Sequence, residues 1–242
     1  MSVLRVIDYV WGVAQLHDIV YVVRYVSSTI TRFNITTRQR LSDIHVAGLQ
    51  WSWDIAACEL TSRVYIAEEA ISVSRVSADG ADIQHWLPKS PDDTFTPSTL
   101  SVTSTRLLVT SLNTHQLTQF QADGDEVRRV QLSDHMEPWH AVESPTETFI
   151  VRLYNVELDL RQVAEIDTLG EVLRQFSGSR LTSLGYTPHF AADSRGNIFV
   201  ADEDNRHVLL LDDHLSLRRV IDEHQQLKYK EPRRLCYNSQ HR

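Results

Sequence analysis

Five short apolar segments recur at nearly constant intervals along this chain. Each contains three consecutive apolar residues of the kind that form a buried strand, at positions 20–22, 64–66, 107–109, 149–151 and 198–200. The steps between them are 44, 43, 42 and 49 residues. A period of this length indicates a repeat architecture, in which every unit is one supersecondary motif. This spacing constrains the fold more than any other feature of the sequence.

Each repeat contains four short β patterns, and they are clearest in the last repeat. There the patterns cover 190–193, 198–202, 207–212 and 215–221, with a Ser-Arg-Gly-Asn turn between the first two. Alternating apolar residues, β-branched side chains and Gly/Asn/Asp/Ser turns favour strands over helices. Four antiparallel strands in 42–49 residues are typical of a propeller blade. The sequence therefore predicts an all-β fold, a β-propeller of four-stranded antiparallel blades.

The blade boundaries follow from the same spacing. We expect one propeller domain over residues 1–242, in which prolines at 97, 138, 188 and 232 each precede an innermost strand. Its complete blades are predicted at approximately 10–50, 51–97, 98–138, 139–188 and 189–232. The longest loops connect one blade to the next, so we expect them to shape one face, the loop face.

A further, incomplete blade is predicted from the two ends of the chain. Residues 2–8 and 216–222 are identical at five of seven positions, so 2–8 is expected to be an outermost strand, as 216–222 is. Residues 233–242 match an innermost strand. The prediction is five complete blades plus the inner and outer strands of a sixth. We expect a monomer unless another chain fills the incomplete blade.

Composition narrows the class of partner. The chain has 24 Lys and Arg against 32 Asp and Glu, a net charge of −8, which argues against binding nucleic acid. No window approaches the 18 apolar residues of a membrane span, so no membrane association is expected. Cys58 and Cys236 lie in apolar, strand-like runs and are expected to be reduced and buried. These observations predict a cytoplasmic or otherwise intracellular location.

The stretch 187–212 resembles the NHL repeat. That repeat runs from a proline through an apolar-Ala-apolar strand and a Gly-Asn turn to an apolar-Val-Ala-Asp strand, followed by Asn and a basic-Val pair. Gly196 and Asn197 match the turn, and Asp202 and Asn205 match the motif after the second strand. The resemblance implies that Asp202 and Asn205 are structural, bonding to the backbone of a turn. It covers one repeat by motif and most of the chain by spacing.

NHL propellers differ widely in function. They include protein-docking modules of ubiquitin ligases, sequence-selective RNA binders and a zinc-dependent lyase, so the fold alone does not define a function. Two histidines bear on the enzymatic alternative. His140 and His189 both lie at the entrance of an innermost strand, where imidazoles could bind zinc. However, His189 directly follows its proline and His140 comes one residue later, so we expect their side chains to point in different directions.

No catalytic set can be assembled from the sequence. Calcium-dependent propeller hydrolases need several converging oxygen ligands, and the repeats supply no matching set. Asp54, Glu143 and Asp193, near the innermost strands, are interpreted as turn residues. No nucleophile elbow, phosphate-cradling loop or Cys-x-x-Cys pair is present. The expectation is that the chain has no cofactor, with zinc or calcium as the alternative.

The resulting functional hypothesis is a non-catalytic scaffold that docks a protein or peptide on the loop face. Tryptophans at blade junctions usually pack one sheet on the next, but some could anchor a partner. The expected contacts are Trp53, Trp139, His140 and His189, near the channel mouth. The alternative is a metal-dependent lyase or hydrolase using His140 and His189. Weaker alternatives are an RNA-binding module and a truncated copy without function.

Overall fold

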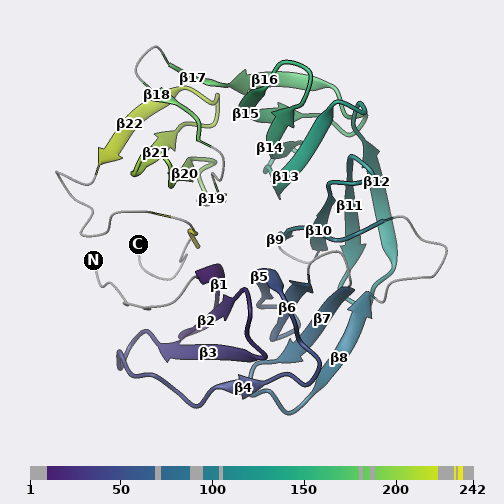
Figure 1. Cartoon of the computed structure of the whole chain (residues 1–242), viewed down its shortest axis with the longest axis vertical. Coiled ribbons are helices and arrows are strands. Elements are labelled where there is room, and N and C mark those ends of the chain that lie inside the picture. The colour runs from purple at the N-terminus through teal and green to yellow at the C-terminus, as the bar shows by residue number, and fades with distance from the viewer. Residues whose placement is uncertain are drawn as a thin grey trace.

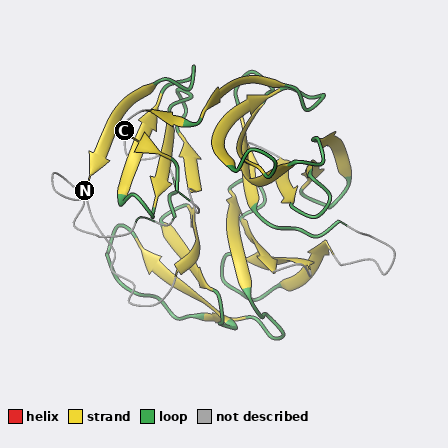
Figure 2. Ribbon diagram, turned by 45° about the horizontal axis from the view of Figure 1, so that its top comes forward, coloured by secondary structure: helices red, strands yellow, loops and turns green. Residues whose placement is uncertain are grey.

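The computed structural model describes residues 10–68, 72–87, 95–103, 106–179, 182–185, 189–222, 232 and 234–236. Every regular element in these ranges is a β-strand (Figure 2). The described part of the chain has no helix that is long and apolar enough to cross a membrane.

Twenty strands form five four-stranded sheets, arranged around a central axis (Figure 1). The innermost strands are β1 (Val10–Leu16), β5 (Ser52–Cys58), β9 (Leu100–Thr103), β13 (Met136–Glu143) and β19 (His189–Ala192). The second strands are β2 (Ile19–Arg24), β6 (Arg63–Glu68), β10 (Arg106–Ser111), β14 (Phe149–Asn155) and β20 (Ile198–Asp202). The third strands are β3 (Thr29–Asn34), β7 (Ser72–Ser77), β11 (Gln116–Gln121), β15 (Leu160–Ile166) and β21 (His207–Leu211). The outermost strands are β4 (Ile44–His45), β8 (Ile83–Leu87), β12 (Glu126–Gln131), β16 (Val172–Phe176) and β22 (Leu217–Asp222).

Within every sheet the strands neighbour one another in chain order and run antiparallel. The predicted all-β propeller of four-stranded antiparallel blades is therefore confirmed. A short hairpin, β17 (Gly178–Ser179) and β18 (Thr182–Ser183), follows the fourth blade. Because the innermost strands all run in the same sense, their first residues meet at one end of the central channel.

The second strand of each blade explains the apolar repeat. In the second, third and fourth blades it is covered on both faces, because the neighbouring blades pack against either side of the sheet, and almost all of β6, β10 and β14 is buried. A strand buried on both faces has a continuous apolar run rather than an alternating one. The outermost strands β8, β12 and β16 are mostly exposed.

The hydrophobic core lies between blades. Four clusters of buried side chains fill the four junctions from the first blade to the fifth. At the first junction, Tyr21 and Ile30 of the first blade contact a cluster that includes Ile66 of the second. Full burial of such a side chain contributes about 1.5–3 kcal/mol. Among the described residues, no cluster joins the fifth blade to the first.

The predicted sixth blade is not confirmed. Its expected outer strand, 2–8, lies outside the described residues, as does most of 233–242. Residues 234–236 are described and are not part of a strand. Cys58 is buried as expected, whereas Cys236 is exposed, and both are free thiols.

Candidate functional site

Three of the five innermost strands have a tryptophan at a β-bulge in their first half. Trp11, Trp53 and Trp139 are the additional residues at these irregularities, as shown by register shifts across Val10/Gly12, Ser52/Asp54 and Pro138/His140. A bulge adds one unpaired residue to a strand and redirects its side chain. The three tryptophans consequently occupy equivalent places at the same end of the channel.

The bulge at Trp139 makes one sequence prediction wrong. His140 and His189 were expected to point in different directions, but their ring centroids lie 4.1 Å apart, at an interplanar angle of 64°. Pro138 was predicted to precede the innermost strand. It belongs instead to that strand, β13, where it pairs with Leu153. Trp139 is the bulge residue, so it absorbs the one-residue difference in spacing and returns His140 to the register of His189.

The interpretation of Asp54 as a turn residue is also wrong. Asp54 lies within β5, is 1% exposed, and accepts a 2.9 Å hydrogen bond from the backbone N–H of Leu100 in the next blade. Asp54, His140 and His189 pair with Ala67, Arg152 and Ala201 of their second strands, respectively. The three residues are thus equivalent positions in the second, fourth and fifth blades.

A signal for this equivalence exists in the sequence. The segments Trp-Asp-Ile-Ala, Trp-His-Ala-Val and Pro-His-Phe-Ala align on their small and apolar residues, and the alignment superimposes Asp54, His140 and His189. Counting from the prolines instead hides it. Glu143, the last residue of β13, accepts a hydrogen bond from Thr103, and Asp193 does lie in a turn.

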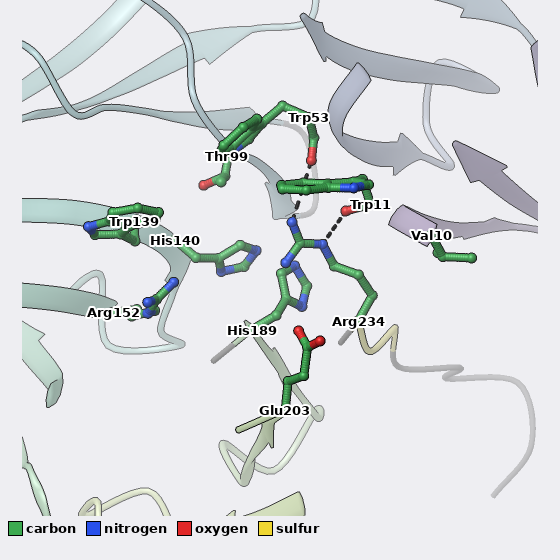
Figure 3. Close-up of a pocket in the computed structure, with 10 residues that line it drawn as sticks. All are labelled: Val10, Trp11, Trp53, Thr99, Trp139, His140, Arg152, His189, Glu203 and Arg234. Atoms are coloured by element: carbon green, nitrogen blue, oxygen red, sulfur yellow. Dashed lines mark hydrogen bonds between the residues drawn. The ribbon is translucent and has the colours of Figure 1, made fainter. Parts of the chain in front are cut away.

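A cavity of about 170 Å³ opens at this end of the channel (Figure 3). Its aromatic and imidazole walls are Trp11, Trp53, Trp139, His140 and His189. Its charged groups are Arg152, Glu203 and Arg234. The four contact residues predicted from the sequence therefore all line one cavity, whereas Trp11 and the three charged residues were missed as site residues.

The C-terminal part of the chain places Arg234 in the cavity. Its Nε donates a hydrogen bond to the backbone carbonyl of Trp11, and its Nη2 lies 3.5 Å from the carbonyl of Trp53 (Figure 3). Beside these carbonyls, the ring of Trp11 packs against Tyr25 and Trp53 at centroid distances of 4.9 and 4.8 Å. Trp11 and Trp53 are bulge residues, which a regular strand ladder would not leave unpaired. Their carbonyl groups accept from the guanidinium of Arg234.

Arg152 provides the second guanidinium of the cavity. Its Cζ lies 4.9 Å from the ring centroid of Trp139, a cation–π geometry, and its side chain is buried. The indole N–H of Trp139 donates to Glu137 at 3.0 Å. Burial, followed by repulsion from Arg234 and Arg161, lowers the pKa of Arg152 to about 9, so it remains protonated at neutral pH.

Burial dominates the electrostatics of the three equivalent residues. It raises the pKa of Asp54 to about 6, against the opposing attraction of Arg234. It lowers the pKa of His140 to about 3, with Arg234 and Arg152 adding to the effect. Burial and the neighbouring His140 place the pKa of His189 well below 6.5. At pH 7 both imidazoles are therefore neutral and Asp54 is mostly ionised.

Among the residues that the structure describes, Asp54, His140 and His189 form the one group of three side chains that could hold a metal ion. Each offers one ligand atom, and the three atoms lie within 4.8 Å of one another. Neutral imidazole and carboxylate are the ligand types that zinc accepts. The set differs from the sequence hypothesis, which had only His140 and His189.

The repeat-motif residues lie in the fifth blade, in two turns. In the first turn, Asp193 accepts hydrogen bonds from the backbone of Arg195 and Asn197 and from the Asn197 side chain. Gly196 has a φ of +81°, a conformation that glycine adopts without strain. In the second turn, buried Asp202 accepts from the backbone and side chain of Asn205. These are local contacts that fix turns.

Comparisons with known proteins identify the fold alone. No protein-family profile and no curated protein matches this sequence. Among solved structures, a nidogen/laminin complex matches with a TM-score of 0.69 at 14% identity, over 89% of this chain and 81% of that chain. The WD40 β-propeller domain of Doa1 matches with a TM-score of 0.63 at 15% identity, over 91% and 71%. A catalytically inactive virginiamycin B lyase from Staphylococcus aureus with quinupristin matches with a TM-score of 0.63 at 13% identity, over 90% of this chain and 70% of that chain. These similarities support a β-propeller, a fold that here serves both binding proteins and an enzyme.

Proposed function

We propose that this chain is a non-catalytic, NHL-like binding scaffold that docks a protein or peptide on the loop face, with an arginine of the partner entering the channel mouth. The observation that carries the proposal is that one arginine side chain, that of Arg234, lies along the cavity and donates to the backbone carbonyl of Trp11. The hydrogen bonds of Arg234 to the carbonyls of Trp11 and Trp53 support a guanidinium as the group that this cavity binds. In the docked state, the partner's arginine takes the place of Arg234.

The cavity suits a guanidinium better than a neutral group. Backbone carbonyls of Trp11 and Trp53 accept its hydrogen bonds, and Glu203 lines the same cavity. Arginine presents five N–H donors in a planar fork and stacks well on aromatic rings. When Arg234 leaves, the buried carboxylate of Asp54 loses the attraction of that guanidinium, so a new cation beside it is favoured.

The size of the cavity, of which Arg234 forms part of the wall, supports a side chain as the ligand. Pockets for drug-sized molecules and cofactors are about 300–1,000 Å³. The cavity here measures about 170 Å³. Trp53 and Trp139, beside His140 and His189, would form the apolar anchor around the inserted side chain, as aromatic residues do in binding hot spots. The nidogen/laminin neighbour supports a protein-docking role for this general architecture, without identifying a partner.

The proposal is tested with a pair of synthetic peptides that differ in one residue. One contains a central arginine, and the other contains citrulline, which has the same shape without the charge. Both are titrated calorimetrically into the full chain and into its Arg234→Gln variant, with chelator present. We expect the arginine peptide to bind Arg234→Gln at least tenfold more tightly than it binds the parent chain, because the competing side chain has been removed. The citrulline peptide should bind neither.

Two tryptophans provide a matched control. Trp53→Ala in the Arg234→Gln background should weaken arginine-peptide binding at least tenfold, whereas Trp51→Ala should leave it unchanged. Trp51 is two residues away, is 45% exposed and does not line the cavity. Equal binding of the arginine and citrulline peptides, or equal effects of the two tryptophan substitutions, would contradict the proposal.

The competing function is a metal-dependent lyase or hydrolase. It is favoured by the proximity of Asp54, His140 and His189 and supported by the fold similarity to the virginiamycin B lyase. Elemental analysis of the purified protein tests its first requirement, a stoichiometric zinc or calcium ion, and cleavage of a substrate by the metal-bound chain would favour this function over a scaffold. If the chain binds the metal but cleaves no substrate, the result favours the scaffold function.

A further inference from the structure

Three buried side chains from three different blades converge beside the cavity. Asp54, His140 and His189 are 1%, 4% and 6% exposed, and their ligand atoms lie within 4.8 Å of one another. Equivalent strand positions hold them, so each is fixed by the sheet of its own blade. This convergence depends on the tertiary structure, since 49 or more residues separate each pair along the chain.

The two imidazoles provide an independent sign of a ligand. The Nδ1 atoms of His140 and His189 are buried, and neither has a hydrogen-bond partner among the residues that the structure describes. Buried polar atoms in native proteins are nearly always paired with protein, water or an ion. Two such atoms in contacting rings, next to a buried carboxylate, point to a ligand that the two imidazoles and the carboxylate share.

The charged groups around Asp54, His140 and His189 determine which cation is favoured beside these three side chains. Arg234 and Arg152 act on both imidazoles from the cavity side, and Arg234 also acts on Asp54. Glu203 lines the same cavity. A guanidinium beside three potential ligands supplies positive charge without coordinating them. A small dication could supply that charge and also engage the two nitrogen atoms.

We propose that Asp54, His140 and His189 bind a divalent transition-metal ion, zinc in the first instance, in exchange for the guanidinium of Arg234. Two nitrogens and one carboxylate oxygen, with a fourth position left for water, form a donor set typical of zinc. Calcium requires six to eight oxygen ligands, which the cluster does not offer. Zinc ligands lie about 2.0–2.2 Å from the metal and therefore about 3.4 Å from each other. Rotation of the two imidazole rings would bring the ligand atoms from their present separation of up to 4.8 Å to that distance.

The test is a zinc titration of the full chain by calorimetry, with cobalt(II) absorption as a spectroscopic measure of coordination. One ion should bind per chain. Asp54→Asn and His189→Gln should each weaken binding at least tenfold, because each removes a ligand. Arg234→Gln should strengthen it about tenfold, because a competing positive charge is lost. Far-ultraviolet circular dichroism and a thermal melt establish that each variant is folded.

His207→Gln is the matched control. His207 is also buried, at 8%, and its Nε2 lies 3.4 Å from a carboxylate oxygen of Asp202, but it belongs to no three-ligand group among the described residues. Zinc affinity should be unchanged in this variant. No stoichiometric zinc binding by Arg234→Gln, or equal losses in His189→Gln and His207→Gln, would overturn the inference.

This inference does not depend on the arginine-peptide proposal. The peptide titrations contain chelator and the zinc titrations contain no peptide, so the two results are obtained separately. If Arg234→Gln binds the arginine peptide but no zinc, the metal site fails and the docking site stands. If it binds zinc but no peptide, the docking site fails and the metal site stands.

Discussion

Two buried aspartates occupy opposite kinds of environment in this propeller. Asp202, in the fifth blade, accepts hydrogen bonds from the backbone N–H of Gly185 and from both the backbone and the side chain of Asn205. Asp54, at the channel mouth, accepts a backbone hydrogen bond and lies beside two imidazoles whose Nδ1 atoms have no hydrogen-bond partner in the described part of the chain. The carboxylate of Asp202 is engaged in hydrogen bonds that stabilise the fold. The polar groups around Asp54 are left for a ligand, and this difference separates a structural cluster from a candidate site.

The largest effect should come from breaking the structural cluster. Asp202→Ala removes an acceptor that is 0% exposed and eliminates its hydrogen bonds with the N–H groups of Gly185 and Asn205. We expect a loss of about 3 kcal/mol in the free energy of unfolding, measured by urea denaturation. Asp202→Asn, which keeps one acceptor oxygen, should lose less. Equal stability of the parent chain and Asp202→Ala would show that the fifth-blade turn is not structural.

A pH dependence should distinguish the channel mouth from the rest of the molecule. Because the folded state lowers the pKa of His140 from 6.5 to about 3, only the unfolded chain takes up this proton between those values. Stability is therefore complete above pH 6.5 and falls as the pH falls, by about 2 kcal/mol at pH 5 for this residue. Asp54 acts with the opposite sign. Its pKa rises from 3.8 to about 6, so its contribution is present below pH 3.8 and is lost as the pH rises through 6.

His140→Gln isolates the histidine contribution. In chelator, the loss of stability between pH 7 and pH 5 should be about 2 kcal/mol smaller in His140→Gln than in the parent chain. Urea denaturation at the two pH values measures it. Parallel pH profiles for the two proteins would mean that His140 is not buried in a site that excludes its charged form.

Asp54→Asn should produce a smaller effect with the reverse sign. At pH 7, the raised pKa of Asp54 means that ionisation opposes folding, and the neutral amide removes this cost. Part of the gain is offset because the amide N–H needs a partner of its own. We expect a net stabilisation of about 1 kcal/mol, together with weaker zinc binding. Destabilisation by Asp54→Asn in chelator would place Asp54 with Asp202, among the structural residues.

The repeat could be predicted because it arises from local chemistry. Second strands are buried on both faces, so their apolar triplets recur with the blade, and the turn residues at 193–197 bond to one another within a few positions. The site could be predicted only in part. Trp53, Trp139, His140 and His189 share one cavity, as the hypothesis requires. That hypothesis remains a proposal.

What the sequence could not show depends on bulges and on distant contacts. The bulges at Trp53 and Trp139 shift the strand register by one residue, which reverses the inferred direction of every side chain beyond them. The shift at Trp139 conceals the relation between His140 and His189. Arg234 reaches the carbonyl of Trp11, 223 residues away, and such a contact has no local sequence pattern.

The central claim, that the channel mouth is a docking site, can be tested directly by the indole N–H signals of the five tryptophans in a ¹H–¹⁵N spectrum. On addition of the arginine peptide to Arg234→Gln, the signals of Trp11, Trp53 and Trp139, which line the cavity, should shift. The signal of Trp86 should not, since its Nε1 is engaged by the carbonyl of Ala122 at 2.8 Å, away from the cavity. Shifts confined to Trp86 or Trp51, or unchanged signals from the three cavity tryptophans at saturating peptide, would contradict the account.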